Sequence, residues 1–415
     1  MKTNNIKYYI ENFDNKEIRF NGFPDAVARE ALNNNTHDDH QHYYDIQLME
    51  HVFDEIDEIP LEEKFYYPIV LVNSNMHRSP MKDSLFIPDD ILRAIRSGQC
   101  FLLIQSVQEG WDFSTYVDHF IEHIQTKYNI KDERIVLMTG NYLTHERYTT
   151  VPHSCWELGM PGHFDPHTPD FIDDIRPYKY ICLNRRHEVH RLAVASALTQ
   201  SDQTGILTVA LGGGYGEKCI SDQLETDFNN RFPELWNSYA NNIREHLPLA
   251  YDDGIDPETT NPNWDPSTEK FQKSYLHIVT ETNATSNQLF FSEKVFKPIT
   301  HWQPFVLCGN YKSLEKLKEF GYKTFGQWID ESYDDEPHYE TKIRKVNAAI
   351  KQFIDKSPKE LTSLMQEMLP TFKHNMRVLR RRAGTDAALS NSNSSVLADT
   401  RDKLYNILKR NNDGT

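Results

Sequence analysis

The chain has 415 residues, of which 26% are charged and 38% are hydrophobic, and its formal net charge is −16. This composition, with 12% aromatic residues, excludes wholesale disorder. The acidic excess also excludes a general role in binding polyanions, because phosphate contacts need clustered Lys and Arg. At about 150 residues per domain, the length predicts two or three domains.

The sequence favours a cytoplasmic protein with no membrane span. No stretch reaches the roughly 18 uninterrupted apolar residues of a membrane helix, and the N-terminal residues lack the apolar core of a signal peptide. The five cysteines are scattered and never form a Cys-x-x-Cys pair, which favours a reducing compartment.

Apolar runs and helical patterns alternate through the first half of the chain. The runs are rich in Val, Ile, Leu or Phe, as buried parallel strands are, and cover 67–75, 100–107 and 134–141. Residues 87–98 predict a helix with an Asp cap and a terminal glycine, Gly98. A second predicted helix within 113–128 places five apolar side chains on one face: Val117, Phe120, Ile121, Ile124 and Tyr128. This alternation predicts an α/β sheet.

Residues 151–178 are dense in Pro, Gly and His and are predicted to cross between two domains. The spacing of His153, His163 and His167 matches no standard metal site, so we expect a surface linker.

The second half repeats the same pattern. Strands are predicted at 179–186, 205–211, 274–282 and 304–310, with helices from about 190 and at 313–321, the latter with a Ser cap and a terminal Gly. Residues 221–272 predict helices and loops, and the tail from 341 is helical, interrupted at 388–396.

We therefore expect two facing Rossmann-type α/β domains with a cleft between them. The predicted divisions are an acceptor-side domain 1–165, a nucleotide-binding domain 166–340 and a helical segment 341–415. Ligands of such sheets lie beyond the carboxyl ends of the strands, so the residues just after the strands are the candidates.

Two cationic segments follow strands of the second half. Arg185 and Arg186 end the predicted strand 179–186, directly after its apolar part. Arg191 falls about one turn later at a helix start, where a guanidinium and a helix N-terminus favour an anion. The alternative is a charged loop that makes surface salt bridges.

The second cationic segment reads SEKVFKPI, residues 292–299. Ser292 can cap a helix, so that Lys294 faces a diphosphate and Glu293 accepts hydrogen bonds from ribose hydroxyls. Pro298 requires this helix to be short or kinked. The alternative is a capped surface helix.

Together these segments carry a resemblance. LNRRHEVHRLAVASAL, followed by VTET, FFSEKVFKPI and QPFVLCGN, resembles the donor-binding domain of GT-B glycosyltransferases, and most closely the α-1,3-fucosyltransferase-like group common in phages and aquatic bacteria. The resemblance covers roughly residues 179–335. It implies that Arg191 and the pair Glu293 and Lys294 hold a sugar nucleotide.

We expect the donor site to include further residues of both segments: Asn184, Arg186, Ser292 and Lys297. The resemblance implies that protein cations and helix dipoles neutralise the leaving diphosphate, whereas GT-A enzymes use a metal bound by an Asp-x-Asp motif. The chain contains no Asp-x-Asp, so we expect no metal and no other cofactor.

Inverting transfer to a hydroxyl needs a general base, which the resemblance places in the N-terminal domain. Glu109 follows strand 100–107 and is the candidate base, with Asp112 as second choice; Trp111 offers a flat face to a sugar. The alternative is a loop acid beside a packed Trp. His77 and Arg78 follow another strand and are expected on the acceptor side.

The expected function is transfer of a sugar from a nucleotide sugar to a hydroxyl, with inversion. The acceptor would be a glycan or lipopolysaccharide precursor, or a hydroxylated base of phage DNA held by the basic run 373–382; otherwise that run is one solvated helix face. If the protein is phage-encoded, it acts in the host cytoplasm. A rival is a non-catalytic module that binds nucleotide or carbohydrate. A kinase is disfavoured because residues 212–218 lack P-loop spacing.

Overall fold

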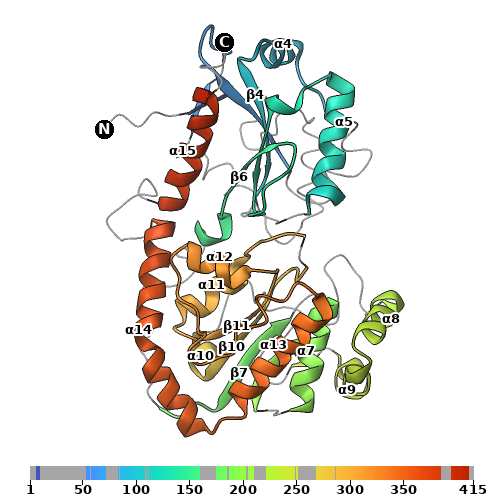
Figure 1. Cartoon of the computed structure of the whole chain (residues 1–415), viewed down its shortest axis with the longest axis vertical. Coiled ribbons are helices and arrows are strands. Elements are labelled where there is room, and N and C mark those ends of the chain that lie inside the picture. Colours follow the sequence, from blue (N-terminus) through green and yellow to red (C-terminus); the bar gives the residue numbers. More distant parts are fainter. Residues whose placement is uncertain are drawn as a thin grey trace. The chain divides into compact units, whose positions relative to one another are not determined.

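The computed structural model describes residues 6–9, 53–56, 58–71, 83, 85–107, 110, 112–158, 174–184, 187–201, 204–209, 221–247, 249–250, 268–285, 287–384 and 394–410. The chain divides into two compact units, 1–158 with 381–415 (unit 1) and 159–380 (unit 2). The tail expected as one helical segment is therefore shared between the units. Each unit contains one sheet with helices packed against it, so the predicted α/β class is confirmed (Figure 1).

The sheet of unit 1 is entirely parallel, in the order β2-β1-β3-β4-β5-β6. Its strands are β1 (Ile6–Tyr9), β2 (Phe53–Ile56), β3 (Phe65–Val70), β4 (Cys100–Ser106), β5 (Ile135–Thr139) and β6 (Thr149–Pro152). The predicted strands correspond to β3, β4 and β5. The three missed strands are only four residues long, too short for a periodic signal.

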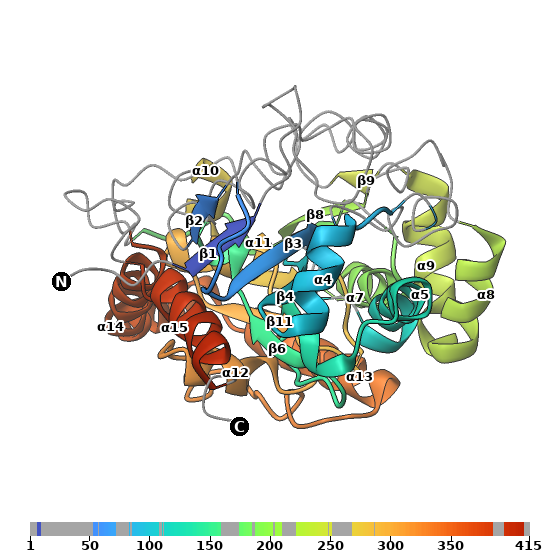
Figure 2. The ribbon, with the colours of Figure 1, turned by 90° about the horizontal axis from the view of Figure 1, so that it is seen from above.

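Side chains alternate between the two faces of this sheet. Phe65 and Tyr67 of β3 face the cluster that includes α4 (Asp89–Ser97) and α5 (Asp118–Tyr128). Tyr66 faces the opposite cluster, where α15 (Ser395–Arg410) packs, and its hydroxyl donates to the carbonyl of Leu404 at 2.8 Å. Figure 2 shows α4 and α5 on one side of the strands and α15 on the other.

The residues expected to cross between domains begin inside unit 1. β6 and residues 153–158 belong to this unit, so the expected linker from 151 was wrong over its first part. His153 is 2% exposed, and its Nδ1 lies 2.9 Å from the Thr400 hydroxyl of α15. It is a core histidine and not a surface residue; His163 and His167 lie outside the described residues.

The ends of α4 and the start of α5 can be compared with the caps predicted from the sequence. Gly98 ends α4 in the left-handed conformation with φ 86°, as predicted. The predicted Asp cap of α4 was wrong: Pro88 occupies the cap position and supplies no side-chain bond. Ahead of α5, the chain makes a π-helical turn, η2 (Phe113–Val117), in which the Asp112 side chain accepts from the Ser114 amide. The face predicted for this helix is buried at four of its five positions, with Val117 in η2, and the fifth, Tyr128, is partly buried.

The sheet of unit 2 has the order β11-β10-β7-β8-β9, with β9 alone antiparallel. Its strands are β7 (Tyr178–Asn184), β8 (Gly205–Val209), β9 (Leu249–Ala250), β10 (Ser274–Thr280) and β11 (Phe305–Cys308). All the strands predicted in this half are present. From β7 the chain moves to β8 on one side and returns at β10 on the other, so a topological switch point lies between β7 and β10.

The helices of unit 2 pack on this sheet or on one another. They are α7 (Val189–Gln200), α8 (Asp222–Arg231), α9 (Trp236–Asn242), α10 (Thr268–Gln272), α11 (Glu293–Thr300), α12 (Ser313–Glu319), α13 (Tyr339–Ile354) and α14 (Pro358–Ala383), which continues into unit 1. α13 contacts both α7 and β11. α11 has eight residues and ends two residues after Pro298, so it is short, as expected from that proline.

The predicted Ser cap of α12 was wrong. Lys312 occupies the cap position, and the carboxylate of Asp334 accepts from the amides of Leu314 at 2.9 Å and Glu315 at 3.0 Å. The Ser313 hydroxyl instead donates to the carbonyl of Asn310 at 2.7 Å. An acid distant in sequence thus replaces the local cap, which spacing along the chain cannot reveal.

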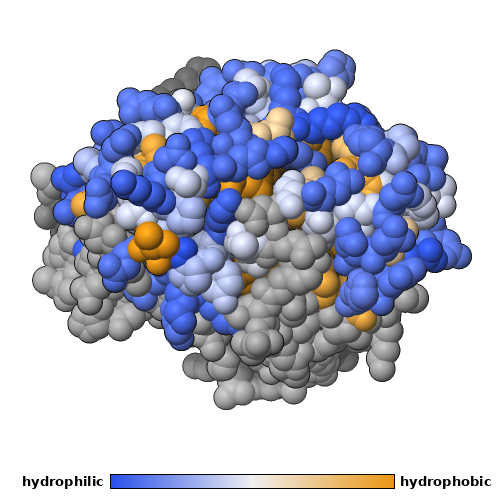
Figure 3. Space-filling model, turned by 90° about the horizontal axis from the view of Figure 1, so that it is seen from below, coloured by the Kyte–Doolittle hydropathy of each residue, from blue (hydrophilic) through white to orange (hydrophobic). Residues whose placement is uncertain are grey.

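The basic run 373–382 is a solvated helix face in part. Lys373, Arg377 and Arg381 lie on the exposed side of α14, as expected for such a run. Arg382 does not, because its guanidinium binds the buried carboxylate of Glu157 with two hydrogen bonds of 2.5 and 2.9 Å. Figure 3 shows a face on which the described residues are mainly hydrophilic.

Candidate functional site

The carboxyl ends of β7 and β10 are joined directly at the switch point. The Thr280 hydroxyl, at the end of β10, donates to the Asn184 side-chain oxygen at 2.6 Å. The Asn184 amide nitrogen of the backbone donates to the Thr208 hydroxyl of β8 at 3.1 Å. Asn184 is 3% exposed, so this predicted donor-binding residue ties three strand ends together at the base of the site.

The first turn of α7 follows β7 and faces the end of β10. His190 Nε2 and Arg191 Nη2 lie 2.8 and 3.0 Å from the carbonyl oxygen of Glu281. Since a carbonyl only accepts, His190 carries its proton on Nε2. Burial, reinforced by the charge of Arg191, lowers the pKa of His190 to about 3, so the imidazole is neutral and Arg191 supplies the positive charge of this turn.

Glu281 is a site residue that the sequence did not single out. It directly follows β10 and is 1% exposed. Its carboxylate accepts from the Ser292 hydroxyl at 2.6 Å and from the backbone amides of Ser292 and Thr282, each at 3.2 Å. Burial raises the pKa of Glu281, although Lys294 and Ser292 act in the opposite direction. The sequence feature that could have identified Glu281 is the position of an acid at the end of a buried strand.

Ser292 caps α11 as predicted, and its hydroxyl has several partners. It accepts from the Lys294 backbone amide at 3.3 Å, while Lys294 Nζ lies 3.2 Å from the same oxygen. Lys294 Nζ also pairs with Glu293 Oε1 at 2.9 Å. The Lys294 side chain is 22% exposed and that of Glu293 only 3%, so Lys294 is the member of this pair that can meet a ligand.

Glu293 is a buried anion stabilised by two lysines. Burial pushes the pKa of its carboxyl upward, but Lys294 and Lys297 outweigh burial and hold the pKa below its usual value. Lys297 lies one helical turn further on and is 3% exposed. Burial lowers the pKa of Lys297 to about 8, partly offset by Glu293. The ribose-binding role expected for Glu293 remains a prediction, and its Oε1 is engaged by Lys294.

The electrostatics of this edge favour an anion. The three cationic side chains Arg191, Lys294 and Lys297 exceed the two carboxylates Glu281 and Glu293 by one formal charge. The N-termini of α7 and α11 belong to the same group of residues and add the positive ends of two helix dipoles. Buried charges act here through a low dielectric, where their potential is screened less than at the surface.

The structure brings together most of the predicted donor-side residues. Asn184, Arg191, Ser292, Glu293, Lys294 and Lys297 all lie within this cluster or at its base. The other predicted site residues lie outside the described part of the chain: Arg186, Glu109, Trp111, His77 and Arg78. Asp112, the second candidate base, accepts from the Ser114 amide at 3.2 Å and hydroxyl at 3.1 Å, which is the role of a helix cap.

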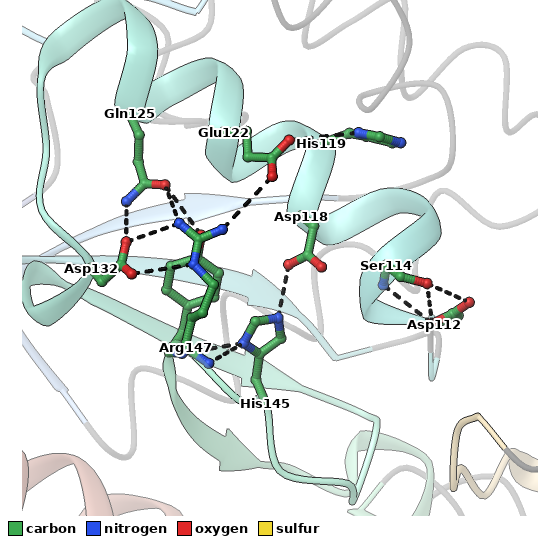
Figure 4. A network of polar contacts seen from close by, with 10 residues as sticks. Asp112, Ser114, Asp118, His119, Glu122, Gln125, Asp132, His145 and Arg147 are labelled. Carbon is green, nitrogen blue, oxygen red and sulfur yellow. Dashed lines mark hydrogen bonds and ion pairs between the residues drawn. The ribbon is translucent and has the colours of Figure 1, made fainter.

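A second polar network lies in unit 1, after β4 and β5 (Figure 4). His145 Nε2 lies 2.8 Å from Asp118, and its Nδ1 accepts from the backbone amides of Arg147 at 3.0 Å and Tyr148 at 3.2 Å. Arg147 in turn pairs with Asp132. Both nitrogens of His145 are therefore used, so the ring holds the loop after β5 in place and offers no free nitrogen for proton abstraction.

Among the described residues, no group of three His, Cys, Asp or Glu side chains is arranged to hold a metal ion. None of the described helices has the length and apolar character needed to cross a membrane. Comparison of the sequence with protein-family models gives no match, and comparison with curated proteins gives none either.

Proposed function

We propose that unit 2 binds a nucleotide sugar at the carboxyl ends of β7 and β10, and that the protein transfers the sugar to a hydroxyl acceptor without a metal. The observation that carries the proposal is the cationic cluster at the switch point of the sheet. Parallel α/β sheets bind ligands at this place, and a diphosphate is the part of a nucleotide sugar that a positive edge with two helix N-termini attracts.

The roles follow from burial. Lys294 is the partly exposed cation and would contact a phosphate oxygen. Arg191 and Lys297 are buried and would act mainly through their charge, stabilising negative charge that develops on the leaving diphosphate. Glu281 would keep the N-terminus of α11 in position through Ser292.

The proposed reaction is inverting transfer by a GT-B enzyme of the α-1,3-fucosyltransferase-like kind. The acceptor hydroxyl would attack the anomeric carbon of the sugar, a carboxylate would take the hydroxyl proton, and the nucleoside diphosphate would leave with the bonding electrons. Glu109 is the proposed carboxylate on the evidence of the sequence alone. The acceptor is proposed to be a glycan, a lipopolysaccharide precursor or a hydroxylated DNA base.

The test of the donor site is a thermal-shift screen with GDP-, UDP-, ADP-, CMP- and dTDP-linked sugars, each with and without EDTA. A ligand at 100 times its Kd stabilises a protein by about 2.7 kcal/mol, so one donor should raise Tm clearly. Lys294→Ala should abolish the shift, whereas Lys323→Ala, at an exposed position of unit 2, should retain it. A shift that needs a metal, or no shift for any donor, would refute the proposal.

Donor binding does not by itself distinguish an enzyme from a binding module. Mass spectrometry of candidate acceptors incubated with the identified donor, together with the rate of donor hydrolysis, measures transfer directly. Glu109→Gln should lower both rates by a factor of about 100 or more while leaving donor affinity unchanged. Unchanged rates in Glu109→Gln would remove that residue from the mechanism, and no turnover in the wild type would favour the binding module.

A further inference from the structure

Lys342 of α13 is a buried lysine close to the candidate site. It is 2% exposed, and its Nζ donates to the carbonyl oxygen of Asn310 at 2.6 Å. Burial lowers the pKa of Lys342 to about 8, while Cys308 and Asp334 act in the opposite direction. Burying an ammonium costs free energy, so the position calls for an explanation beyond filling space.

The Asn310 carbonyl accepts from two donors. The Ser313 hydroxyl already donates to the same oxygen at 2.7 Å, and a neutral donor would serve as well as an ammonium. Asp334 is the nearby carboxylate, but both its oxygens accept from amides of α12. A hydrogen bond to this carbonyl would need only a neutral donor. The bond alone therefore does not explain why the buried donor is a lysine ammonium.

The Asn310 side chain reaches the segment that leads into the site. Its amide nitrogen donates to the carbonyl of Thr285 at 3.1 Å, and its oxygen accepts from the amide of Phe290 at 3.1 Å. Phe290 is followed two residues later by Ser292, which Glu281 binds. The Glu281–Ser292 contact thus holds the two ends of this segment together, and Asn310 holds Thr285 and Phe290 between them.

We propose that Lys342 is a positioning residue for the candidate anion site: it fixes Asn310, which holds Thr285 and Phe290. Asn310 thereby sets the position of Ser292 and Lys294. The inference rests on the proposed function for its effect on nucleotide affinity, but not for its effect on the loop. Lys342 also acts on His190 of the candidate site. Burial lowers the pKa of His190 most, and the charges of Arg191, Lys342 and Lys294 lower it further. Lys342 therefore adds its charge to the edge where the anion is expected.

The first measurement is hydrogen exchange in the free protein, followed by mass spectrometry of peptides. Lys342→Met should raise the exchange rates of amides in 283–294 by about tenfold or more, while peptides of β7 and α7 should exchange at the wild-type rate. Lys351→Met is the matched control, because Lys351 lies on the same helix with a side chain 60% exposed and should leave the loop unchanged.

A second variant keeps the proposal testable if Lys342→Met does not fold. Asn310→Ser retains the backbone carbonyl and the Lys342 bond but removes both side-chain bonds to the loop, so it should reproduce the fast exchange of 283–294. Exchange that rises throughout unit 2 in Lys342→Met would show a purely structural lysine. Loop exchange that stays at the wild-type rate in both variants would also overturn the proposal.

The second measurement is affinity for the nucleotide sugar found in the thermal-shift screen, by titration calorimetry. Lys342→Met should raise its Kd by about tenfold, a loss of about 1.4 kcal/mol, and Lys351→Met should not change it. An unchanged Kd despite fast loop exchange would overturn the positioning role. If the wild type binds no nucleotide, the proposed function fails, and the exchange measurement still decides whether Lys342 holds the loop.

Discussion

Glu281 and Ser292 are joined by two hydrogen bonds, one to the Ser292 backbone amide at 3.2 Å and one to its hydroxyl at 2.6 Å. The first residue after β10 thereby holds the residue that caps α11. The contact closes residues 281–292 into a loop whose two ends meet at the carboxyl edge of the sheet. The buried Glu281 carboxylate accepts from three donors and is stabilised by the charge of Lys294. Its removal therefore affects the position of Ser292 and the start of α11.

Replacing Glu281 with Gln should destabilise the protein. The amide retains one acceptor but turns an NH₂ group toward a donor that the carboxylate satisfied, and an unmade buried hydrogen bond costs about 1–3 kcal/mol. Urea denaturation should show this loss in the free energy of unfolding. Glu319→Gln, at a side chain 56% exposed on α12, is the control and should change stability little. Equal stability of Glu281→Gln and wild type would contradict the role assigned to this carboxylate.

The proposed donor affinity should fall as pH rises through about 8. The pKa of Lys297 is lowered to about 8 by burial, so the free protein loses this charge as pH rises from 7 to 9, and an anion binds less well to the neutral amine. A unit charge about 8 Å away at an effective dielectric near 20 contributes about 2 kcal/mol, so the change can exceed tenfold in Kd.

Calorimetric titrations of the nucleotide sugar across this pH range measure the effect. Lys297→Met should bind more weakly at pH 7 and should show a smaller decrease toward pH 9. It should not abolish the decrease, because the pKa of Lys342 is also lowered to about 8 by burial. A wild-type Kd that stays constant from pH 7 to 9 would show that the buried lysines do not contribute to binding.

The fold was predictable where periodicity is strong. The seven runs rich in Val, Ile, Leu and Phe all form strands, because burial on both faces of a parallel sheet requires nearly continuous apolar sequence. β9, with two residues, and the four-residue β1, β2 and β6 gave no such signal. Their pairing depends on neighbouring strands that sequence spacing does not identify.

The sequence predicted the cationic residues and the helix cap of the candidate site, but not the residues that hold them in position. Cations and a helix cap after strands pointed to Arg191, Ser292 and Lys294, since helix N-termini and strand ends follow from local pattern. Glu281 and Lys342 became visible only in three dimensions. Glu281 falls within the predicted strand 274–282, and nothing in the sequence separates it from an ordinary acid at a strand end. Lys342 lies more than thirty residues beyond the last strand, in a helix expected to form a separate segment.

His145 should be important for stability and not for catalysis. Its two nitrogens bind Asp118 and two backbone amides, so His145→Ala should leave buried groups unsatisfied and lower the free energy of unfolding by about 1–3 kcal/mol. His119→Ala, at a side chain 70% exposed on the same helix as Asp118, is the control. A large loss of the proposed transferase activity in His145→Ala, with unchanged stability, would instead identify His145 as a residue of the reaction.

Acid should destabilise unit 1 through His153. Burial lowers the pKa of His153 from 6.5 to about 4, so between these values the unfolded chain binds a proton that the folded protein does not. Stability is therefore complete above about pH 6.5 and is lost as pH falls toward 4, by at most about 3 kcal/mol for this one group. The buried histidines His190, His277 and His301, whose pKa values are also lowered, add to the slope in the same direction.

His153→Asn isolates the contribution of His153 from that of the other histidines. An Asn side chain does not titrate and can keep a hydrogen bond to the Thr400 hydroxyl, so the variant should lose less stability than wild type between pH 6.5 and 4. His246→Asn, at an exposed position, should follow the wild-type curve. Urea denaturation at several pH values gives the slopes. Parallel curves for wild type and His153→Asn would mean that this imidazole is protonated equally in the folded and unfolded states, which its burial against α15 makes unfavourable.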